Sequence, residues 1–395
     1  MKEQLTLGRV AAVDVFRALT MFLMLFVNDI PGLRNIPAWL NHADMNEDLM
    51  GFADTIFPAF LFCMGMSVSF AIQNRYRKGD STLQVVGHIF WRTVALVLMG
   101  LFSLNSGGVP DGLSHAWFLL LMVVGFFLLW GVYPRHPQGY YRYFVPVLKT
   151  VGLLLLAGLV LYKDMHGKPF HTGWWGILGL IGWTYAVCAV TYLFTRESLR
   201  KTLMVWAAFI LLAVLNSSSL IPETYSLRAV LLPFVPGGWT HHALGMSGVL
   251  VSILMQRYAH RSWKKFVAIL CALGLGMLLL AWAAHPFWII SKILATPSWL
   301  FFCLAAFFPL FGLFYWLTDV RKRAAWFDLI KPAGTATLTC YILSYAWYAV
   351  WELLGLHYPA LLSAGVPGLL RSLCFSLLLV LLAGGLVKLH IKLKV

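Results

Sequence analysis

The sequence predicts an all-α integral membrane protein, a polytopic bundle of about 12 transmembrane helices with both termini in the cytoplasm. Composition is the first observation: 60% of the 395 residues are hydrophobic and 11% are charged, which leaves too little polar surface to cover soluble domains. The second is that apolar stretches close to the ~20 residues needed to cross a bilayer recur along the whole chain. We therefore expect residues 1–395 to form a single transmembrane domain.

The expected spans follow one another with short polar loops between them. They lie near 10–28, 53–73, 84–104, 115–133, 144–162, 175–194, 202–216, 240–256, 265–284, 298–317, 333–354 and 367–387. The seventh is short, and 115–162 can be divided differently, so the predicted number is 10–12. The first run carries Asp14 and Arg17 and has no small-residue cleavage site, so we expect it to remain a membrane helix rather than a signal peptide.

The formal net charge of +15 is distributed unevenly between the two sides of these spans. Loops on one side hold most of the lysines and arginines, whereas the opposite loops carry only Arg34, Lys163, Lys168, Arg228 and Lys292. The positive-inside rule assigns the richer side to the cytoplasm. The charge thus encodes orientation, which argues against nucleic acid as a partner. It can also attract an anionic cytoplasmic ligand.

The six cysteines do not indicate a disulfide framework or a metal cluster. Each falls inside an apolar run and no two form a CxxC pair, so they read as small buried hydrophobic residues. The adjacent pair His241–His242, placed near the outer face, is a weak signal for a metal by itself. We predict no metal site.

Charged residues inside the first and third spans are candidates for a binding role. Asp14 and Arg17 are three residues apart, which places them on one helical face, where they can pair. A charge deep in lipid costs roughly 2.5–3.5 kcal/mol, so both should face the bundle interior. Arg17 either fixes packing through an ion pair or meets a phosphate from the cytoplasm. Arg92, in the first third of its span, has the same two interpretations.

Polar residues at the outer end of the first span are candidates for catalysis. Asn28 ends this span, and His42 follows in an acidic loop with Asp44, Glu47, Asp48 and Asp54. Such residues are most often a helix cap and a solvated loop histidine. A neutral imidazole with a pKa near ~6.5 nevertheless suits a general base, and a neighbouring carboxylate can orient one of its nitrogens.

Two segments carry a family resemblance. RVAAVDVFRALTMFLMLFVN and NHADMNEDLMGFADTIFPAFLFCMGMSVSF resemble the opening of the heparan-alpha-glucosaminide N-acetyltransferase family of transmembrane acyltransferases, of which this would be a bacterial-type member. The positions that agree with that family's pattern include polar, proline and glycine residues: Arg9, Asp14, Phe16, Arg17, Val27, Asn28, His42, Ala53, Asp54, Phe57, Pro58, Phe60, Phe62, Met64 and Gly65. Later segments around FWRTVALVLMGLF, SKILATPSW and IKPAGTATLTCYILSY are similar, so roughly half the chain is covered.

The resemblance implies a function and a set of roles. It implies acetyl-CoA as a donor bound from the cytoplasm, with His42 and Asn28 as the active residues on the outer face. His42 would be the base or the acyl carrier, and Asn28 a donor to the oxyanion. Asp54, Asp14 and Lys292 would support them, with Lys292 holding the acceptor or the oxyanion unless it is simply solvated. Arg17 and Arg92 would bind the phosphates of acetyl-CoA.

The resemblance also sets expectations about topology, acceptor and location. The family core has ten membrane helices, so we take 113–165 as an inserted helical hairpin. The expected acceptor is an amino sugar or glycan fragment of a bacterial cell envelope, outside an inner membrane. The resemblance also allows a homodimer.

Departures from the family pattern concern the acceptor side. The loop from Asn28 to His42 is longer, an acidic stretch around Asp44–Asp48 replaces the family's W-N-G, and Ala18 replaces a glycine. The donor side is therefore better matched than the acceptor pocket. The main alternative is a multi-pass permease for amino sugars or related solutes, because twelve helices with short loops are also common among transporters.

Overall fold

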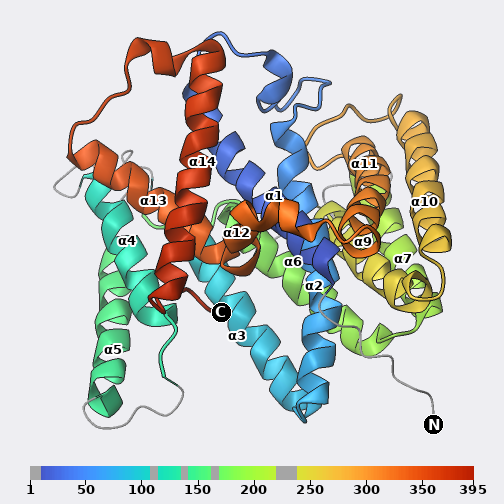
Figure 1. Ribbon diagram of the computed structural model, residues 1–395, viewed down its shortest axis with the longest axis horizontal. Coiled ribbons are helices and arrows are strands. Elements are labelled where there is room, and N and C mark those ends of the chain that lie inside the picture. Colours follow the sequence, from blue (N-terminus) through green and yellow to red (C-terminus); the bar gives the residue numbers. More distant parts are fainter. Residues whose placement is uncertain (1–9, 107–113, 135–140, 162–168, 219–237) are drawn as a thin grey trace. The chain divides into compact units, whose positions relative to one another are not determined.

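The computed structural model describes residues 10–106, 114–134, 141–161, 169–218 and 238–395 (Figure 1). These residues form helices, with two isolated β-bridges between Arg34 and Ala364 and between Gly131 and Leu393. The prediction of an all-helical protein is confirmed over the described ranges. Lys163, Lys168 and Arg228, which belong to loops predicted to face outward, lie outside them.

A helix coincides with each of the twelve predicted spans. The helices are α1 (Ala11–Asp29), α2 (Ala53–Arg77), α3 (Thr82–Leu104), α4 (His115–Trp130), α5 (Tyr141–Val160), α6 (Gly176–Thr195), α7 (Leu199–Ser217), α9 (Thr240–Leu254), α10 (Trp263–Ala284), α11 (Pro297–Tyr315), α13 (Thr337–Leu353) and α14 (Gly365–Lys388). Short helical turns, η1 (Ile30–Gly32), η2 (Ala38–Leu40), η6 (Ala324–Ile330) and η7 (Ala360–Ser363), lie in the connections. The π-helical segments η4 (Met255–Ala259) and η5 (Trp316–Val320) extend α9 and α11, and α12 (Lys331–Thr335) precedes α13.

Nine helices among the described residues are long and apolar enough to cross a membrane, and α4 is a shorter apolar helix. The chain is accordingly a multi-pass membrane protein. A total of twelve spans and the cytoplasmic position of the termini stay predictions. The helices α4 and α5 occupy the place of the predicted hairpin at 113–165, and its status as an insertion also stays a prediction.

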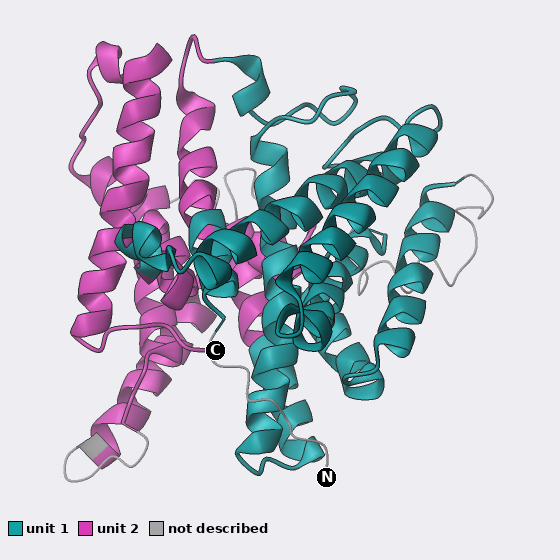
Figure 2. Ribbon diagram, turned by 45° about the vertical axis from the view of Figure 1, so that its right-hand side comes forward, with its two compact units in different colours: residues 1–20, 37–93, 183–331 teal, residues 21–36, 94–182, 332–395 magenta. Residues whose placement is uncertain are grey.

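The chain divides into two compact units, which Figure 2 colours separately. Unit 1 comprises residues 1–20, 37–93 and 183–331, and unit 2 comprises residues 21–36, 94–182 and 332–395. Boundaries fall inside α1, α3, α6 and the short α12, so each of these helices contributes residues to both units, and one more falls in the loop after η1.

Close packing between α2 and α9 forms the centre of unit 1. A methyl group added at Gly65 would overlap the carbonyl of Gly245, and one added at Gly248 would overlap the carbonyl of Phe62. Small residues that let two backbones approach in this way are typical of membrane helix interfaces. The Phe62 ring is fully buried and packs edge-on against Phe16 and Phe308. This contact fixes the beginning of α2, which carries Asp54.

Glycines also allow close packing between α4 and α5 in unit 2. A methyl group at Gly125 would press on Leu156, and one at Gly152 on Leu128. The helix α13 packs on α4 and α14. Only 22% of the apolar stretch of α5 is buried inside the protein, so most side chains of this helix point outward.

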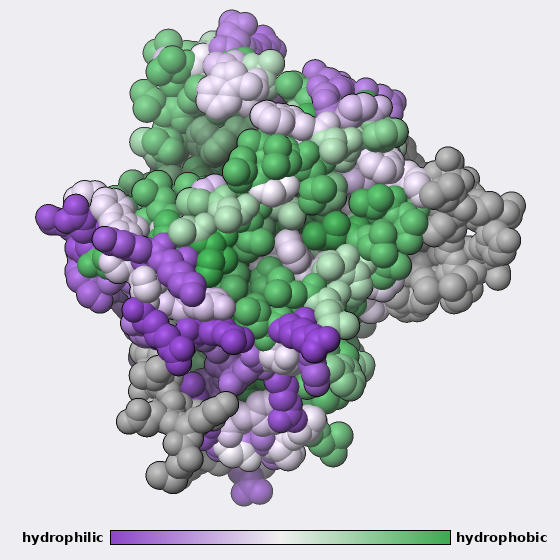
Figure 3. Space-filling model, turned by 90° about the vertical axis from the view of Figure 1, so that its right-hand side faces the viewer, coloured by the Kyte–Doolittle hydropathy of each residue, from purple (hydrophilic) through white to green (hydrophobic). Residues whose placement is uncertain are grey.

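Exposed apolar side chains are expected where helices face lipid. Figure 3 shows such residues over most of the middle of one face, with hydrophilic residues toward its edges. This exposure corrects the prediction that all six cysteines are buried, because Cys271 on α10 and Cys374 on α14 are exposed. An apolar run does not reveal which side of a membrane helix faces lipid. The other four cysteines are buried, and all six are free thiols.

Candidate active site

His42 lies in the loop between η2 and α2 of unit 1, with its imidazole directed at a buried carboxylate. Its Nδ1 is 2.7 Å from Oδ1 of Asp54, the second residue of α2. Asp54 is only 2% exposed, whereas the side chain of His42 is 36% exposed. The histidine is thus anchored from inside while part of its ring remains accessible.

Asp54 is held by groups on three sides. Its Oδ2 accepts hydrogen bonds from the backbone N–H of Ala43 at 2.9 Å and of Gly51 at 3.2 Å. Its backbone carbonyl accepts one from Nε1 of the fully buried Trp299, at 3.2 Å. Two backbone donors on one oxygen are the environment of an ionised carboxylate. We therefore assign the hydrogen of His42 to Nδ1, which leaves Nε2 as the basic nitrogen.

Gly51 is required at its position by a close backbone approach. A Cβ there would overlap the carbonyl oxygen of Asn41, the residue before His42. The neighbouring bond from the N–H of Phe52 to the carbonyl of Trp39, at 2.6 Å, closes the same loop. The absence of a side chain at Gly51 thus allows the loop to fold back onto the start of α2 and present His42 to Asp54.

Lys292 reaches the same pair from the segment between α10 and α11. Its Nζ lies 3.1 Å from Nδ1 of His42 and 3.6 Å from Oδ1 of Asp54. The side chain is 25% exposed. Burial lowers the pKa of Lys292, and the adjacent Asp54 carboxylate partly offsets this effect. The ammonium and the Nδ1–H thus both face a single carboxylate oxygen.

A tight turn positions Lys292. The backbone N–H of Ala295 bonds the carbonyl of Lys292 at 3.1 Å, and that of Thr296 bonds the carbonyl of Ser291 at 3.1 Å. Thr296 caps α11 by accepting a bond from the N–H of Trp299. Ala295 has a left-handed φ of 52°, and its carbonyl accepts a hydrogen bond from the Thr240 hydroxyl at 2.7 Å. These bonds tie the lysine to the N-terminal ends of α9 and α11.

A second contact joins the His42 loop to this segment. His285 Nε2 lies 2.8 Å from Oδ2 of Asp48, and the N–H of Ile290 donates to Oδ1 of Asp48 at 2.8 Å. The Ile290 N–H, with the His285 contact, lowers the pKa of Asp48. The Ser291 hydroxyl donates to the carbonyl of Met45 at 2.8 Å. The acidic stretch of the loop therefore serves in part as an anchor for the segment that carries Lys292.

Two adjacent histidines of α9 are buried among aromatic side chains instead of lying at a solvated surface. His241 is 5% exposed and packs edge-on against Phe57 and Trp299. His242 is fully buried against Phe209 and Trp239. The pair is enclosed by protein, because α9 is buried along its whole length, and its position near the outer face stays a prediction. No group of three or more His, Cys, Asp or Glu suited to a metal occurs among the described residues.

Asn28 lies in unit 2, exposed at the end of α1. The adjacent Asp29 accepts hydrogen bonds from the Tyr348 hydroxyl at 2.9 Å, from Arg371 Nη2 at 2.8 Å and from the Ser372 hydroxyl at 2.6 Å. These bonds anchor the end of α1 to α13 and α14. Since His42 belongs to unit 1, the proximity of Asn28 to His42 stays a prediction.

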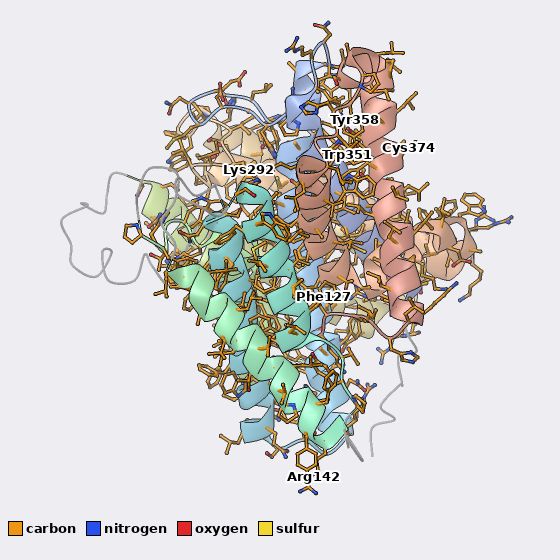
Figure 4. The ribbon with its side chains drawn as sticks, turned by 90° about the vertical axis from the view of Figure 1, so that its left-hand side faces the viewer. Phe127, Arg142, Lys292, Trp351, Tyr358 and Cys374 are labelled. Atoms are coloured by element: carbon orange, nitrogen blue, oxygen red, sulfur yellow. The ribbon has the colours of Figure 1, made fainter. Side chains whose placement is uncertain are left out.

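An aromatic stack supports the Arg371–Asp29 pair. The Arg371 guanidinium lies 4.2 Å from the centroid of the Tyr358 ring, whose other partner is Trp351 at 4.9 Å and an interplanar angle of 20°. Figure 4 shows Trp351 and Tyr358 toward one end of unit 2 and Arg142 at the other. Cation–π contact and stacking restrict the guanidinium to one orientation.

The predicted phosphate-binding arginines lie elsewhere in unit 1. Arg17 Nη2 bonds Asp14 at 2.6 Å, and Nη1 donates to the Ser67 hydroxyl of α2 at 3.2 Å, so the predicted pair forms within α1. Arg92 lies 4.7 Å from the centroid of the Tyr185 ring, and its buried Nε has no hydrogen-bond partner among the described residues. Phosphate binding by either arginine stays a prediction.

The structure brings together His42, Asp54 and Lys292, and it adds residues that the sequence did not single out. These are Gly51, Trp299 and His285. Asp319 has a separate role, because its carboxylate accepts hydrogen bonds from the N–H groups of Ala11 and Ala12 at the start of α1. Only Gly51 carried a local signal, as a glycine immediately before a helix. The others depend on contacts between segments far apart in the sequence.

Comparison with known proteins gives two findings. The family model described as "Domain of unknown function (DUF5009)" matches residues 9–254, more than half of the chain. The heparan-alpha-glucosaminide N-acetyltransferase of Mus musculus is 35% identical over 99 residues, which cover 25% of this chain and 14% of that protein. The Homo sapiens protein of the same name is 34% identical over 98 residues, with the same coverage. The chain thus matches about 14% of the length of these curated relatives.

Proposed function

Because the chain belongs to the DUF5009 family and shares sequence with two heparan-alpha-glucosaminide N-acetyltransferases, we propose that it is a transmembrane acetyltransferase. It transfers an acetyl group from cytoplasmic acetyl-CoA to the amine of an amino sugar or glycan fragment on the opposite side of the membrane. The contact between His42 and the buried Asp54 is the observation that carries this proposal.

His42 is suited to act as the general base. The acceptor amine attacks the thioester carbonyl carbon, and its proton moves to Nε2 of His42. The tetrahedral intermediate then expels the CoA thiolate, which takes the proton from His42, so the imidazole returns to its neutral form. Asp54 stabilises the transient imidazolium through Nδ1, in the manner of the carboxylate in a Ser-His-Asp triad.

The oxyanion of the intermediate needs a fixed donor. The Asn28 amide, exposed at the end of α1, is one candidate. The Lys292 ammonium, already beside His42, is the other. Either group would stabilise charge that develops only in the transition state, which is how such donors accelerate acyl transfer.

A two-step route uses the same residues. His42 Nε2 attacks the thioester itself and carries the acetyl group, and the amine then displaces the imidazole. Incubation with acetyl-labelled acetyl-CoA and no acceptor separates the two routes. A label on wild-type protein that is absent from the His42→Ala variant indicates the acetyl-imidazole route, and its absence from both indicates direct transfer.

The donor is an anion that cannot enter hydrocarbon, so its phosphates must remain at the predicted cytoplasmic side. Arg92 fits a phosphate contact better than Arg17, since Arg17 is engaged by Asp14 and Ser67 while the Nε of Arg92 lacks a partner among the described residues. The extended pantetheine arm would cross much of a core ~30 Å thick to present its thioester near His42.

The acceptor would be recognised by charge. Asp44 and Glu47 are exposed carboxylates in the His42 loop. They favour a protonated amino sugar arriving from solvent over a neutral or anionic sugar. The amine must then lose its proton near His42 before it attacks.

The decisive experiment uses purified protein in liposomes with labelled acetyl-CoA and a panel of amino sugars. We expect wild type to transfer the acetyl group and His42→Ala to lose transfer. The control His260→Ala, at an exposed histidine on another loop, should retain it. Uptake of sugar without consumption of acetyl-CoA would instead establish a permease. In vesicles of known orientation, CoA should appear on one face and acetylated sugar on the other, and a need for both substrates on the same face would exclude transfer through the membrane.

A further inference from the structure

A cavity in unit 2 is formed by residues that have no role in the proposed acetyl transfer. It has a volume of about 500 Å³ and is lined by residues 131–134 after α4, by Val145 and Lys149 of α5, and by Lys394. We refer to it as the α4–α5 cavity.

Backbone pairing builds one wall of the α4–α5 cavity. The N–H of Val132 donates to the carbonyl of Lys392 at 2.9 Å, and the N–H of Lys394 donates to the carbonyl of Trp130 at 2.9 Å. The N–H of Leu393 donates to the Thr339 hydroxyl at 3.0 Å, which ties the same segment to α13. Lys394 is therefore placed at the cavity by fixed backbone.

Two ammonium groups line this cavity with no acidic residue beside them. The Nζ of Lys149 lies 5.6 Å from the centroid of the Tyr133 ring, and the Tyr133 hydroxyl is engaged by the carbonyl of Leu128 at 2.7 Å. Neither Lys149 nor Lys394 forms an ion pair with a carboxylate among the described residues. The excess positive charge at this concave surface favours binding of an anionic group.

Apolar surface borders the cavity on the membrane side. Lys149 is seven residues beyond Arg142, roughly 10 Å further along α5 at 1.5 Å per residue. Leu153, one turn further on the same face, is 56% exposed, and Val160 beyond it is 41% exposed. A lysine exposed on the side of a membrane helix is costly unless its charge reaches the interface or meets an anion. The anion that satisfies both surfaces carries a phosphate and an acyl chain.

We propose that the α4–α5 cavity binds an anionic phospholipid, with its phosphate between Lys149 and Lys394 and its acyl chain along α5 past Leu153. Basic pockets between membrane helices recognise phospholipid headgroups through this combination of charge and apolar surface. A soluble phosphate compound would use the two lysines but gain nothing from the exposed leucine and valine.

The test compares thermal unfolding of the purified protein in detergent with added phosphatidylglycerol, phosphatidylcholine of the same acyl chains, or glycerol phosphate. We expect phosphatidylglycerol alone to raise the unfolding temperature. Lys149→Gln combined with Lys394→Gln should weaken apparent phosphatidylglycerol affinity roughly 30-fold, at about 1 kcal/mol per lysine. Retention of phosphatidylglycerol in native mass spectrometry should fall in parallel.

A matched control is Lys264→Gln combined with Lys265→Gln. These lysines also lie over aromatic rings, 5.8 Å from Trp263 and 5.2 Å from Tyr258, but do not line the cavity. Lys149→Arg with Lys394→Arg retains both charges and should retain phosphatidylglycerol, which separates lost recognition from lost folding. An equal effect of the control, or equal stabilisation by phosphatidylcholine or glycerol phosphate, would overturn the proposal.

Discussion

Lys292 and His42 are 250 positions apart in the sequence, yet Nζ of Lys292 lies 3.1 Å from Nδ1 of His42. The Asp54 carboxylate accounts for this proximity, because its Oδ1 lies 2.7 Å from Nδ1 of His42 and 3.6 Å from Nζ of Lys292 and so faces both donors. His42 therefore presents Nε2, the nitrogen not engaged by these groups, to any substrate.

Asp54→Asn should lower the turnover number by roughly 100-fold or more, the usual contribution of an oriented general base. The amide removes the charge that stabilises the imidazolium and permits the other tautomer of His42. The KM for acetyl-CoA should change little. Steady-state kinetics on Asp54→Asn and on the control Asp328→Asn, at an exposed aspartate outside the His42 loop, check this. Equal kinetics for Asp54→Asn and wild type would remove Asp54 from the mechanism.

Lys292 should define the alkaline limb of the pH–rate profile. Burial lowers its pKa, so it loses its proton at a lower pH than an exposed lysine, and turnover should fall as pH rises through that value. Lys292→Arg stays charged and should shift the limb to higher pH, whereas Lys292→Gln should be slow throughout and lack this limb. Profiles from about pH 6 to pH 10 test the assignment. An unchanged limb in Lys292→Arg would assign it to another group.

The lowered pKa of Lys292 also makes the stability of the protein depend on pH. The folded chain binds fewer protons at Lys292 than the unfolded chain does once pH exceeds the lowered pKa. Stability from this residue should therefore rise with pH up to the unfolded value of ~10.4. Wild type should gain stability relative to Lys292→Gln across that window.

Gly51→Ala should disrupt the His42 loop without unfolding the helices. The added methyl overlaps the Asn41 carbonyl, so the loop must move and the bond from Gly51 N–H to Asp54 is lost. We expect a loss of about 1–3 kcal/mol in unfolding free energy and at least a tenfold loss of activity. Gly32→Ala is the control, because no atom lies within 4 Å of a Cβ at that glycine. Circular dichroism and activity should be measured on both variants. Equal activity in Gly51→Ala and Gly32→Ala would contradict this expectation.

Arg371→Met should destabilise the protein more than most single substitutions. It leaves the Asp29 carboxylate, which is 8% exposed, without its cationic partner, at a cost of roughly 3–5 kcal/mol. Tyr348→Phe removes one hydrogen bond and should cost only about 1 kcal/mol. Thermal unfolding in detergent ranks these variants against Arg142→Met, a change at an exposed arginine. Equal unfolding temperatures for Arg371→Met and Arg142→Met would show that the ion pair between Arg371 and Asp29 does not stabilise the protein.

Side-specific labelling tests the predicted orientation. A cysteine at Lys322, in a loop on the basic side, should resist an impermeant thiol reagent in intact cells, whereas a cysteine at Thr172 should react. The positive-inside rule gives this direction because lysines and arginines concentrate on the Lys322 side. The opposite pattern of labelling would reverse every assignment of sides.

The sequence predicted the helices well because uninterrupted apolar runs of membrane length are rare in proteins that do not cross a bilayer. It predicted His42 and Asp54 as site residues through family resemblance, and Lys292 from its place in an outer segment, but not the geometry that brings the three together. Trp299 and His285 were missed, since a tryptophan or histidine beside an apolar run carries no local sign of its partner. The exposed Cys271 was misjudged for a related reason: composition gives the length of a membrane helix but not which face meets lipid.

The long helices α1, α3 and α6 each contribute one part to unit 1 and another to unit 2, as does the short α12. No single cut in the chain can therefore separate the units, and a fragment that contains all of one necessarily includes much of the other. Gene fragments that begin or end between helices should fail to yield either unit alone. Insertions and fusion tags are better tolerated at loop tips such as Gly79, where an added Cβ meets no atom within 4 Å. For protein engineering, the two units have to be moved between hosts together.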